Sequence, residues 1–363
     1  MRGSQSIVLT SKNFAFLLIA AMQEVGILQI TCRTARYAGH DAWISVLLAA
    51  VFPLAGLFLI NGLCSRFPRD SLARISDRVL GPVPGKAVSF AYVAYTMFNA
   101  AMAIRLFTEL ANSFLLAKTP GWVLALLLTL GAAYIFSRDI ASIAWMTEFT
   151  YYLIQPLWIV LLAALSRADY RNLLPVGDNG LSNILLGMQG AFLSYIGAEI
   201  LLVLYPFIQN KREVLRAGML AVAWSAFFYT SLALIVTMAF GGGVVKLFVW
   251  DNLALIKTYH LPVIERAEFF VAIIYSWLAL RAAAVLLYTA RQTISGAAGV
   301  SEKYRRQVVA ILAAGVFALA LLPGNFSEVV QYTKYVGLAG VSMMLGLPSL
   351  LWTLAVIRGL RGT

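Results

Sequence analysis

Charged residues are scarce in this chain of 363 residues. Only 12% of its residues are Asp, Glu, Lys or Arg, whereas soluble domains average about 25%. Hydrophobic residues make up 61% of the chain, and the mean hydropathy is +0.82. So little charge cannot cover a surface that faces water on all sides, which excludes an ordinary soluble domain. The composition therefore predicts an integral membrane protein.

Cysteine and histidine are nearly absent as well. Cys32 and Cys64 are too few for a disulfide framework. His40 and His260 are predicted to lie in loops and do not form a zinc-ligand pattern. The sequence also has no nucleophile triad and no glycine loop of the kind that cradles phosphate. These absences predict a protein that uses no cofactor or metal and is not an enzyme.

Long apolar runs dominate the rest of the chain. A helix that spans a bilayer needs about 20 apolar residues, and the runs are too long for the strands of a membrane barrel. The chain is therefore predicted to be an all-α integral membrane protein with ten transmembrane helices in one domain, residues 1–363. The predicted spans are residues 13–32, 41–63, 86–116, 121–137, 142–165, 183–207, 216–240, 263–290, 306–322 and 334–357.

The net charge of +12 is distributed unevenly between the predicted loops. Most Lys and Arg residues lie on the side of both termini, in the segments 66–86, 211–216 and 291–306. Cytoplasmic loops carry such an excess, so both termini are predicted to be cytoplasmic. This distribution argues against a nucleic-acid partner, and it leaves attraction to anionic membrane lipid as the role of the basic excess.

Two apolar runs contain a glycine close to a glutamate. The first run reads "MQEVGILQI" (22–30), with Glu24 and Gly26, and the sixth reads "SYIGAEILLVLYP" (194–206), with Gly197 and Glu199. In inverted-repeat transporters, discontinuous helices in matching positions of the two halves bind the substrate. The pattern predicts a five-plus-five repeat, with residues 13–165 and 183–357 as its halves and helices 1 and 6 broken. The alternative is that both glycines only permit close helix packing.

Ionisable residues inside predicted spans are costly and are normally paired or functional. Glu24 and Glu199 have three open roles: accepting a ligand ammonium group, carrying a proton, or capping a half-helix. Arg105 and Glu109 are spaced i, i+4, which predicts a structural ion pair. A further set of side chains has positions suited to line a cavity or to pack between helices. These are Tyr95 and Asn99, whereas Arg281 is a further ionisable residue inside a predicted span.

The segment "VWDNLALIKTYHLP" (249–262) is predicted to form a short amphipathic helix on the surface. One interpretation is a cap over an outer vestibule. The other is an interfacial anchor through Trp250 and Tyr259. Three prolines inside predicted spans, Pro53, Pro156 and Pro348, predict kinks.

Several stretches in order along the chain resemble one known family. They are "AGHDAWISVLL" (38–48), "RLFTELANSFLLAKTP" (105–120), "GAEILLVLYPF" (197–207) and "VIERAEFF" (263–270). The chain resembles the B subunit of spore germinant receptors, a branch of the amino acid–polyamine–cation transporter superfamily. That resemblance implies the LeuT-like five-plus-five inverted repeat. It also implies a small-molecule germinant, typically an amino acid, and receptor A and C subunits as partners in the inner membrane of a bacterial spore.

The resemblance also implies which positions contact a ligand. These positions lie at the two breaks and on the third and eighth spans. They are Glu24, Val25, Gly26, Ile196, Gly197, Ala198, Glu199, Tyr95, Asn99, Arg281 and Ala282. The chain departs from the family pattern in two places, because Glu24 stands where a glycine is usual and Thr31 where a proline is usual. Glu24 would repel a ligand carboxylate unless it is protonated or paired, for instance with Arg281.

Three functions are compatible with these residues. The first is a germinant sensor, in which ligand binding shifts the subunit between two states. The second is a proton-coupled amino-acid permease, with Glu24 or Glu199 as the proton carrier. The third is a ligand-gated conduit for ions or water, with Tyr95 as its gate.

Overall fold

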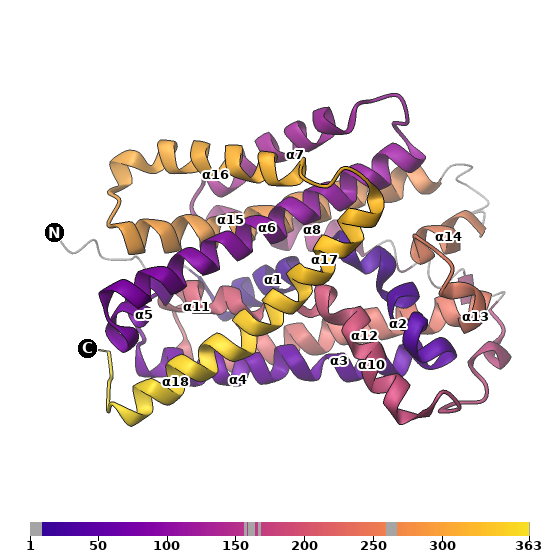
Figure 1. Ribbon diagram of the computed structural model, residues 1–363, viewed down its shortest axis with the longest axis horizontal. Coiled ribbons are helices and arrows are strands. Elements are labelled where there is room, and N and C mark those ends of the chain that lie inside the picture. Colours follow the sequence, from indigo (N-terminus) through magenta and orange to yellow (C-terminus); the bar gives the residue numbers. More distant parts are fainter. Residues whose placement is uncertain (1–8, 156–157, 159–163, 166–167, 259–266, 363) are drawn as a thin grey trace.

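The computed structural model describes residues 9–155, 158, 164–165, 168–258 and 267–362 (Figure 1). Within these ranges the chain is helical, and the only β-type pairing is a single bridge between Leu9 and Ile208. That bridge is held by Leu9 N–H donating to the Phe207 carbonyl at 3.0 Å and Gln209 N–H donating to the Leu9 carbonyl at 2.9 Å. It joins the segment before the first helix to the end of the sixth predicted span.

The first half of the chain begins with an interrupted helix, which further helices of different lengths follow. Its elements, in order, are α1 (Ser11–Met22), the 3-10 helix η1 (Val25–Gln29), α2 (Ile30–Ala38), η2 (Gly39–Asp41), α3 (Ala42–Ala49), α4 (Val51–Arg66), α5 (Leu72–Leu80), α6 (Pro82–Phe114), α7 (Gly121–Phe136) and α8 (Ile140–Ile154).

The second half begins with a second interrupted helix. Its elements are η3 (Tyr170–Leu173), α10 (Gly180–Tyr195), η4 (Ala198–Ile200), α11 (Leu201–Leu204), η5 (Tyr205–Phe207), η6 (Lys211–Glu213), α12 (Val214–Phe240), α13 (Gly242–Val245), α14 (Asp251–Thr258), α15 (Ala267–Ala298), η7 (Glu302–Tyr304), α16 (Arg305–Ala320), α17 (Phe326–Val341), the π-helix η8 (Ser342–Gly346) and α18 (Leu347–Ile357).

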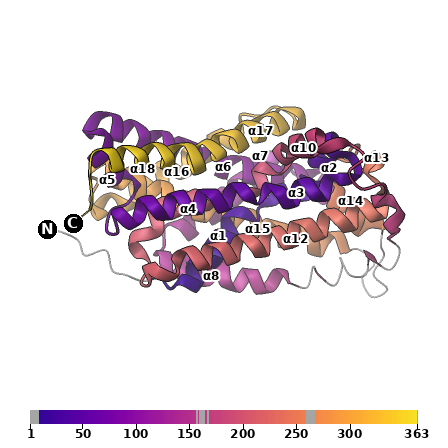
Figure 2. The same ribbon diagram turned by 90° about the horizontal axis from the view of Figure 1, so that it is seen from below.

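The long helices run along the bundle, with α1 in its interior. Helices α6 and α15 pack side by side, and α1 packs against α8, α12 and α15. Residues 14 and 16–22 of α1 are buried. Helices α2, α13 and α14 lie at one end of the molecule, and α5 and the end of α18 lie at the other (Figures 1 and 2). The central position of α1 means that its interrupted end lies inside the protein.

Within the described residues, every predicted span overlaps helical segments, but the number of spans stays a prediction. By length and apolar composition, the described residues contain five helices that could cross a membrane, or six if the bent pair around residue 196 is one span. The short α1 and α7 fall below that length. Helix α5 lies outside the predicted spans; it is amphipathic, buries Leu72, Ile75 and Val79 and packs against α6.

Two of the three prolines lie beside irregular helix geometry. The helix is interrupted at Ala50, three residues before Pro53, and the π-helix η8 ends two residues before Pro348. Proline cannot donate the backbone hydrogen bond of a helix interior, which accounts for both positions. Pro156 lies outside the described residues.

Close packing of α2 on α10 depends on Gly190. A Cβ atom on this residue would lie 2.7 Å from the carbonyl carbon of Arg33 and from the backbone nitrogen of Thr34. Backbone atoms cannot move aside as a flexible side chain can. The two helices therefore approach each other only because this position has no side chain.

We expect Gly190→Ala to lower the free energy of unfolding by about 1–3 kcal/mol, because it overpacks this contact. The measurement is the melting temperature of the detergent-purified protein. Gly243→Ala is the matched control, since a Cβ there would meet no atom within 4 Å. Equal melting temperatures for the two variants would contradict the close approach of α2 and α10.

Candidate functional site

The first interruption lies at Gln23 and Glu24. Helix α1 ends at Met22, Gln23 has φ −85° and ψ 77°, and Glu24 is extended with φ −105° and ψ −169°. Gly26 lies inside η1 and does not have positive φ. Its missing side chain instead leaves room for Leu193, whose Cδ2 would be 3.1 Å from a Cβ. Because α1 ends at Met22 and α2 begins at Ile30, Gly26 lies inside the break, where its lack of a side chain serves close packing.

Side chains from three other helices bind the carbonyl groups that the first interruption frees. The Tyr229 hydroxyl of α12 lies 2.9 Å from the Met22 carbonyl oxygen. Arg281 Nη2 of α15 donates to the Gln23 carbonyl at 3.2 Å, and Asn252 Nδ2 of α14 donates to the Ile27 carbonyl at 2.7 Å. Buried backbone groups need such partners, so these side chains maintain the interruption.

The second interruption lies at Ile196 and Gly197. Gly197 has φ 137°, a conformation that residues with a side chain rarely adopt. The helical segments before and after it are bent by 44°. A Cβ on Gly197 would lie 3.1 Å from both Ala21 Cβ and Met22 Cγ. The second interruption is thus in direct contact with the end of α1.

Both carboxylate oxygens of Glu199 accept hydrogen bonds within the second interruption. Its Oε2 accepts a hydrogen bond from the Gly197 N–H at 2.8 Å, and its Oε1 accepts one from the Tyr95 hydroxyl at 2.6 Å. The side chain is completely buried. Of the three roles that the sequence left open for this glutamate, these contacts favour capping of the half-helix.

Glu24 and Arg281 differ from Glu199, because each retains a polar atom without a partner. Glu24 is 2% exposed and Arg281 is 0% exposed. In the described part of the chain, Glu24 Oε2 and the Nε and Nη1 atoms of Arg281 have no hydrogen-bond partner, and no ion pair joins the two residues. Leaving such a group unsatisfied costs about 1–3 kcal/mol or more. Each of these two residues therefore keeps hydrogen-bonding capacity that a further polar group could use.

The remaining predicted site residues have separate positions. Asn99 is buried on α6, and its Oδ1 has no partner among the described residues. Ala282 is buried on α15 beside Arg281. Val25 and Ala198 are buried in η1 and η4. The Nη2 atom of Arg105 and the Oε1 atom of Glu109 lie 2.7 Å apart, as their spacing requires, on a part of α6 beyond Asn99.

Helix α14 packs over η1 and the start of α2. Asp251 Oδ2 accepts a hydrogen bond from the Cys32 N–H at 2.9 Å. Burial raises the pKa of the Asp251 carboxyl group to about 7. Trp250 is 6% exposed, and its ring lies 5.5 Å from that of Phe326. The cap interpretation fits these contacts better than an anchor at the membrane interface, although Tyr259 lies outside the described residues.

Sequence reasoning missed Tyr229, whose hydroxyl also lies 3.0 Å from the Ser194 carbonyl at the end of α10. A tyrosine inside the apolar run 216–240 was the available signal, because a buried hydroxyl usually has a hydrogen-bond partner. Which partner it takes is not visible from the sequence, since Met22 is 207 positions away.

We expect Tyr229→Phe to lower the free energy of unfolding by about 1–3 kcal/mol, because the carbonyls at both interruptions lose their shared donor. Thermal unfolding in detergent measures this change. Tyr195→Phe is the matched control: its ring lies 5.1 Å from that of Tyr229, but its hydroxyl has no partner among the described residues. If Tyr195→Phe lowers the free energy of unfolding as much as Tyr229→Phe does, the special role of Tyr229 is contradicted.

Most of the chain matches one protein family. Residues 8–329 match the spore permease family, described as spore germination protein. Spore germination protein GerQB of Bacillus cereus is 26% identical over 90% of this chain and 89% of its own length. Spore germination protein YndE of Bacillus subtilis (strain 168) is 23% identical over 88% of this chain and 89% of its own length.

Solved transporter structures share the fold at low sequence identity. A Na+-coupled sialic acid symporter, substrate-bound and outward-open, has a TM-score of 0.70 at 12% identity, covering 93% of this chain and 77% of its own. A nucleobase–cation symporter with bound bromovinylhydantoin has a TM-score of 0.67 at 13% identity, covering 99% and 82%. MhsT in complex with L-phenylalanine has a TM-score of 0.61 at 12% identity, covering 96% and 89%. The fold is therefore that of the LeuT-like membrane transporters, and the chain belongs to the spore germination protein family.

Proposed function

We propose that this chain is the B subunit of a spore germinant receptor and binds an amino-acid germinant between its two helix interruptions. It acts with receptor A and C subunits in the inner membrane of the spore, with both termini on the cytoplasmic side. The observation that carries the proposal is the meeting of the interruptions at Gly197 and Met22, beside buried polar atoms that have no partner.

The two unpaired charges suggest the pose of the ligand. The carboxylate of an amino acid suits the Nε and Nη1 atoms of Arg281, because a guanidinium binds planar anions through several donors. The ammonium group suits Glu24 Oε2. This pose removes the conflict between a ligand carboxylate and Glu24, since the negative group of the ligand faces Arg281 instead. The solved structure of similar fold that holds L-phenylalanine supports an amino acid as the ligand class.

We expect one or more amino acids to raise the melting temperature of the purified protein, because a ligand that binds only the native state stabilises it. At a ligand concentration of 100 times the Kd, that stabilisation is about 2.7 kcal/mol. The test panel contains amino acids, sugars and nucleosides. Glu24→Gln and Arg281→Gln should each abolish the response.

Glu148→Gln is the matched control for this experiment. It also neutralises a glutamate, but Glu148 pairs with Lys12 at 2.6 Å, and the Lys12 side chain is 64% exposed. Such a surface pair contributes little to stability. A response that persists in Glu24→Gln and in Arg281→Gln would place the ligand elsewhere. A response to sugars or nucleosides alone would exclude the amino-acid assignment.

A second candidate is a proton-coupled amino-acid permease, which the unpartnered, buried Glu24 carboxyl group favours. Here a pH gradient should drive amino-acid accumulation in liposomes that contain the protein. Glu24→Gln should abolish accumulation, because this substitution removes the proton-carrying group. Glu199→Gln should retain part of the activity, since Glu199 serves the helix cap. If the protein binds the amino acid but a pH gradient drives no uptake, the permease is excluded and the sensor role is supported.

A further inference from the structure

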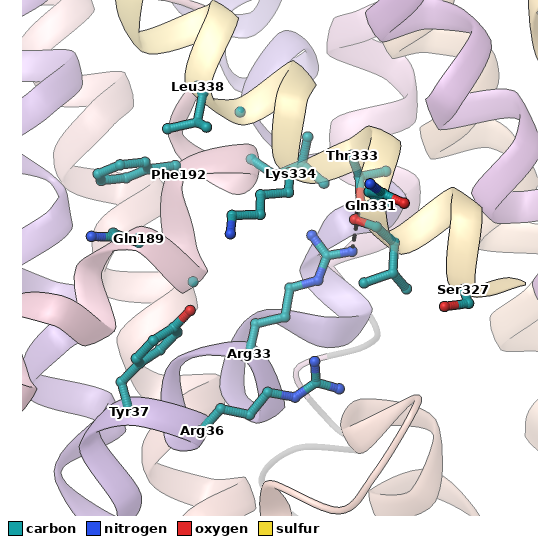
Figure 3. A pocket seen from close by; sticks show the side chains of 14 residues that line it. Arg33, Arg36, Tyr37, Gln189, Phe192, Ser327, Gln331, Thr333, Lys334 and Leu338 are labelled. Atoms are coloured by element: carbon teal, nitrogen blue, oxygen red, sulfur yellow. Dashed lines mark hydrogen bonds between the residues drawn. The ribbon is translucent and has the colours of Figure 1, made fainter.

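A cavity of about 360 Å³ lies between α2, α10 and α17, at the end of the bundle that carries α13 and α14 (Figures 1 and 3). None of the residues predicted to contact the germinant lines it. The lining residues include three cations: Arg33 and Arg36 from α2 and Lys334 from α17. No Asp or Glu is among its lining residues. The cavity is therefore a concentrated positive site, separate from the site between the interruptions.

Among the described residues, the three cations are not directly paired with a counter-ion. Within the described ranges, no carboxylate forms an ion pair with any of the three. Arg33 donates only to neutral oxygens, Gln29 Oε1 at 2.5 Å and Thr333 Oγ1 at 3.2 Å. The side chains of Arg36 and Lys334 make no hydrogen bond to described residues. Like charges held together repel each other, more strongly beside a low-dielectric membrane than in water.

The side chains around the cations add neutral donors. Figure 3 shows the Lys334 side chain extending toward the side of the cavity that holds Gln189 and the Tyr37 hydroxyl, with the Arg33 guanidinium group on the other side. Guanidinium groups bind carboxylate and phosphate through parallel hydrogen bonds, and an ammonium group adds a point charge. We propose that this cavity binds a carboxylate or phosphate group between Arg33, Arg36 and Lys334.

An anion in this cavity would act on the first interruption through two contacts. Arg33 donates to Gln29, the last residue of η1, and Gln29 Nε2 donates to the Val249 carbonyl at 2.9 Å, just before α14. Leu193 lines the cavity and also packs on Gly26 inside η1. A bound anion joins α2 to α17 and so stabilises this arrangement of η1. Anion binding and germinant binding are therefore expected to be coupled, although they use different residues.

The first experiment measures the affinity of the purified full chain for succinate and for inorganic phosphate in detergent, by thermal shift. Arg36→Gln and Lys334→Gln should each weaken binding about tenfold, the effect of losing one charge-assisted contact of about 1.4 kcal/mol. Both side chains are exposed, so neither substitution removes buried structure. Lys246→Gln, an exposed cation at the end of α13 outside the cavity, should leave the affinity unchanged.

The second arm asks whether the anion is a lipid headgroup. The protein is placed in nanodiscs of phosphatidylcholine with or without phosphatidylglycerol, and retained phosphatidylglycerol is counted by native mass spectrometry. Binding of succinate or phosphate that weakens in both variants assigns the cavity to a soluble anion. Retention of phosphatidylglycerol that falls in the same variants, without a response to soluble anions, assigns it to lipid.

The proposal is overturned if Arg36→Gln and Lys334→Gln match the wild type and Lys246→Gln in both arms. Anion binding should survive in Glu24→Gln, which lacks the proposed ligand contact between the interruptions. Loss of the amino-acid response in Glu24→Gln with retained anion binding would therefore support two sites. Loss of anion binding in Glu24→Gln alone, with no effect of the cavity variants, would place the anion between the interruptions.

Discussion

One hydroxyl group holds the two interrupted helices in register. Tyr229 lies within hydrogen-bonding distance of the Met22 carbonyl at the end of α1 and of the Ser194 carbonyl at the end of α10. Inside a membrane protein no bulk water replaces a missing partner, so an interrupted helix persists only where side chains bind its freed backbone groups. Arg281 and Asn252 serve the same requirement at Gln23 and Ile27. The polar chemistry of the site follows from this requirement.

The two glutamates show how the same local pattern acquires different roles. Both lie near a glycine in an apolar run, yet Glu199 accepts hydrogen bonds from Gly197 and Tyr95, whereas Glu24 keeps an oxygen without a described partner. The difference arises because the Tyr95 hydroxyl on α6 donates its hydrogen bond to Glu199. A carboxylate already bound by neighbours has little capacity left for a ligand. Glu24 is therefore the better candidate for recognition or proton transfer.

The cationic cavity and the site between the interruptions are neighbours. Leu193 lines the cavity on one side and packs on Gly26 on the other, and Arg33 contacts Gln29. A charge bound in the cavity would thus act on the same short 3-10 helix at which we propose that the germinant binds. In a receptor, such an arrangement lets a second molecule change the response without competing for the germinant site.

The sequence alone determined the membrane-helix class, the approximate positions of the long apolar helices and the pairing of Arg105 with Glu109. These depend on apolar length and on spacing within one helix, which are local properties. A glycine close to a glutamate indicated both interruptions in the sequence. That pattern did not show that the two glycines differ: Gly26 packs on Leu193, whereas Gly197 has a φ of 137°. Only the tertiary structure decided that distinction, the partners of Tyr229, and the gathering of Arg33 with Lys334. Contacts between residues hundreds of positions apart depend on how helices pack, and local periodicity does not predict that packing.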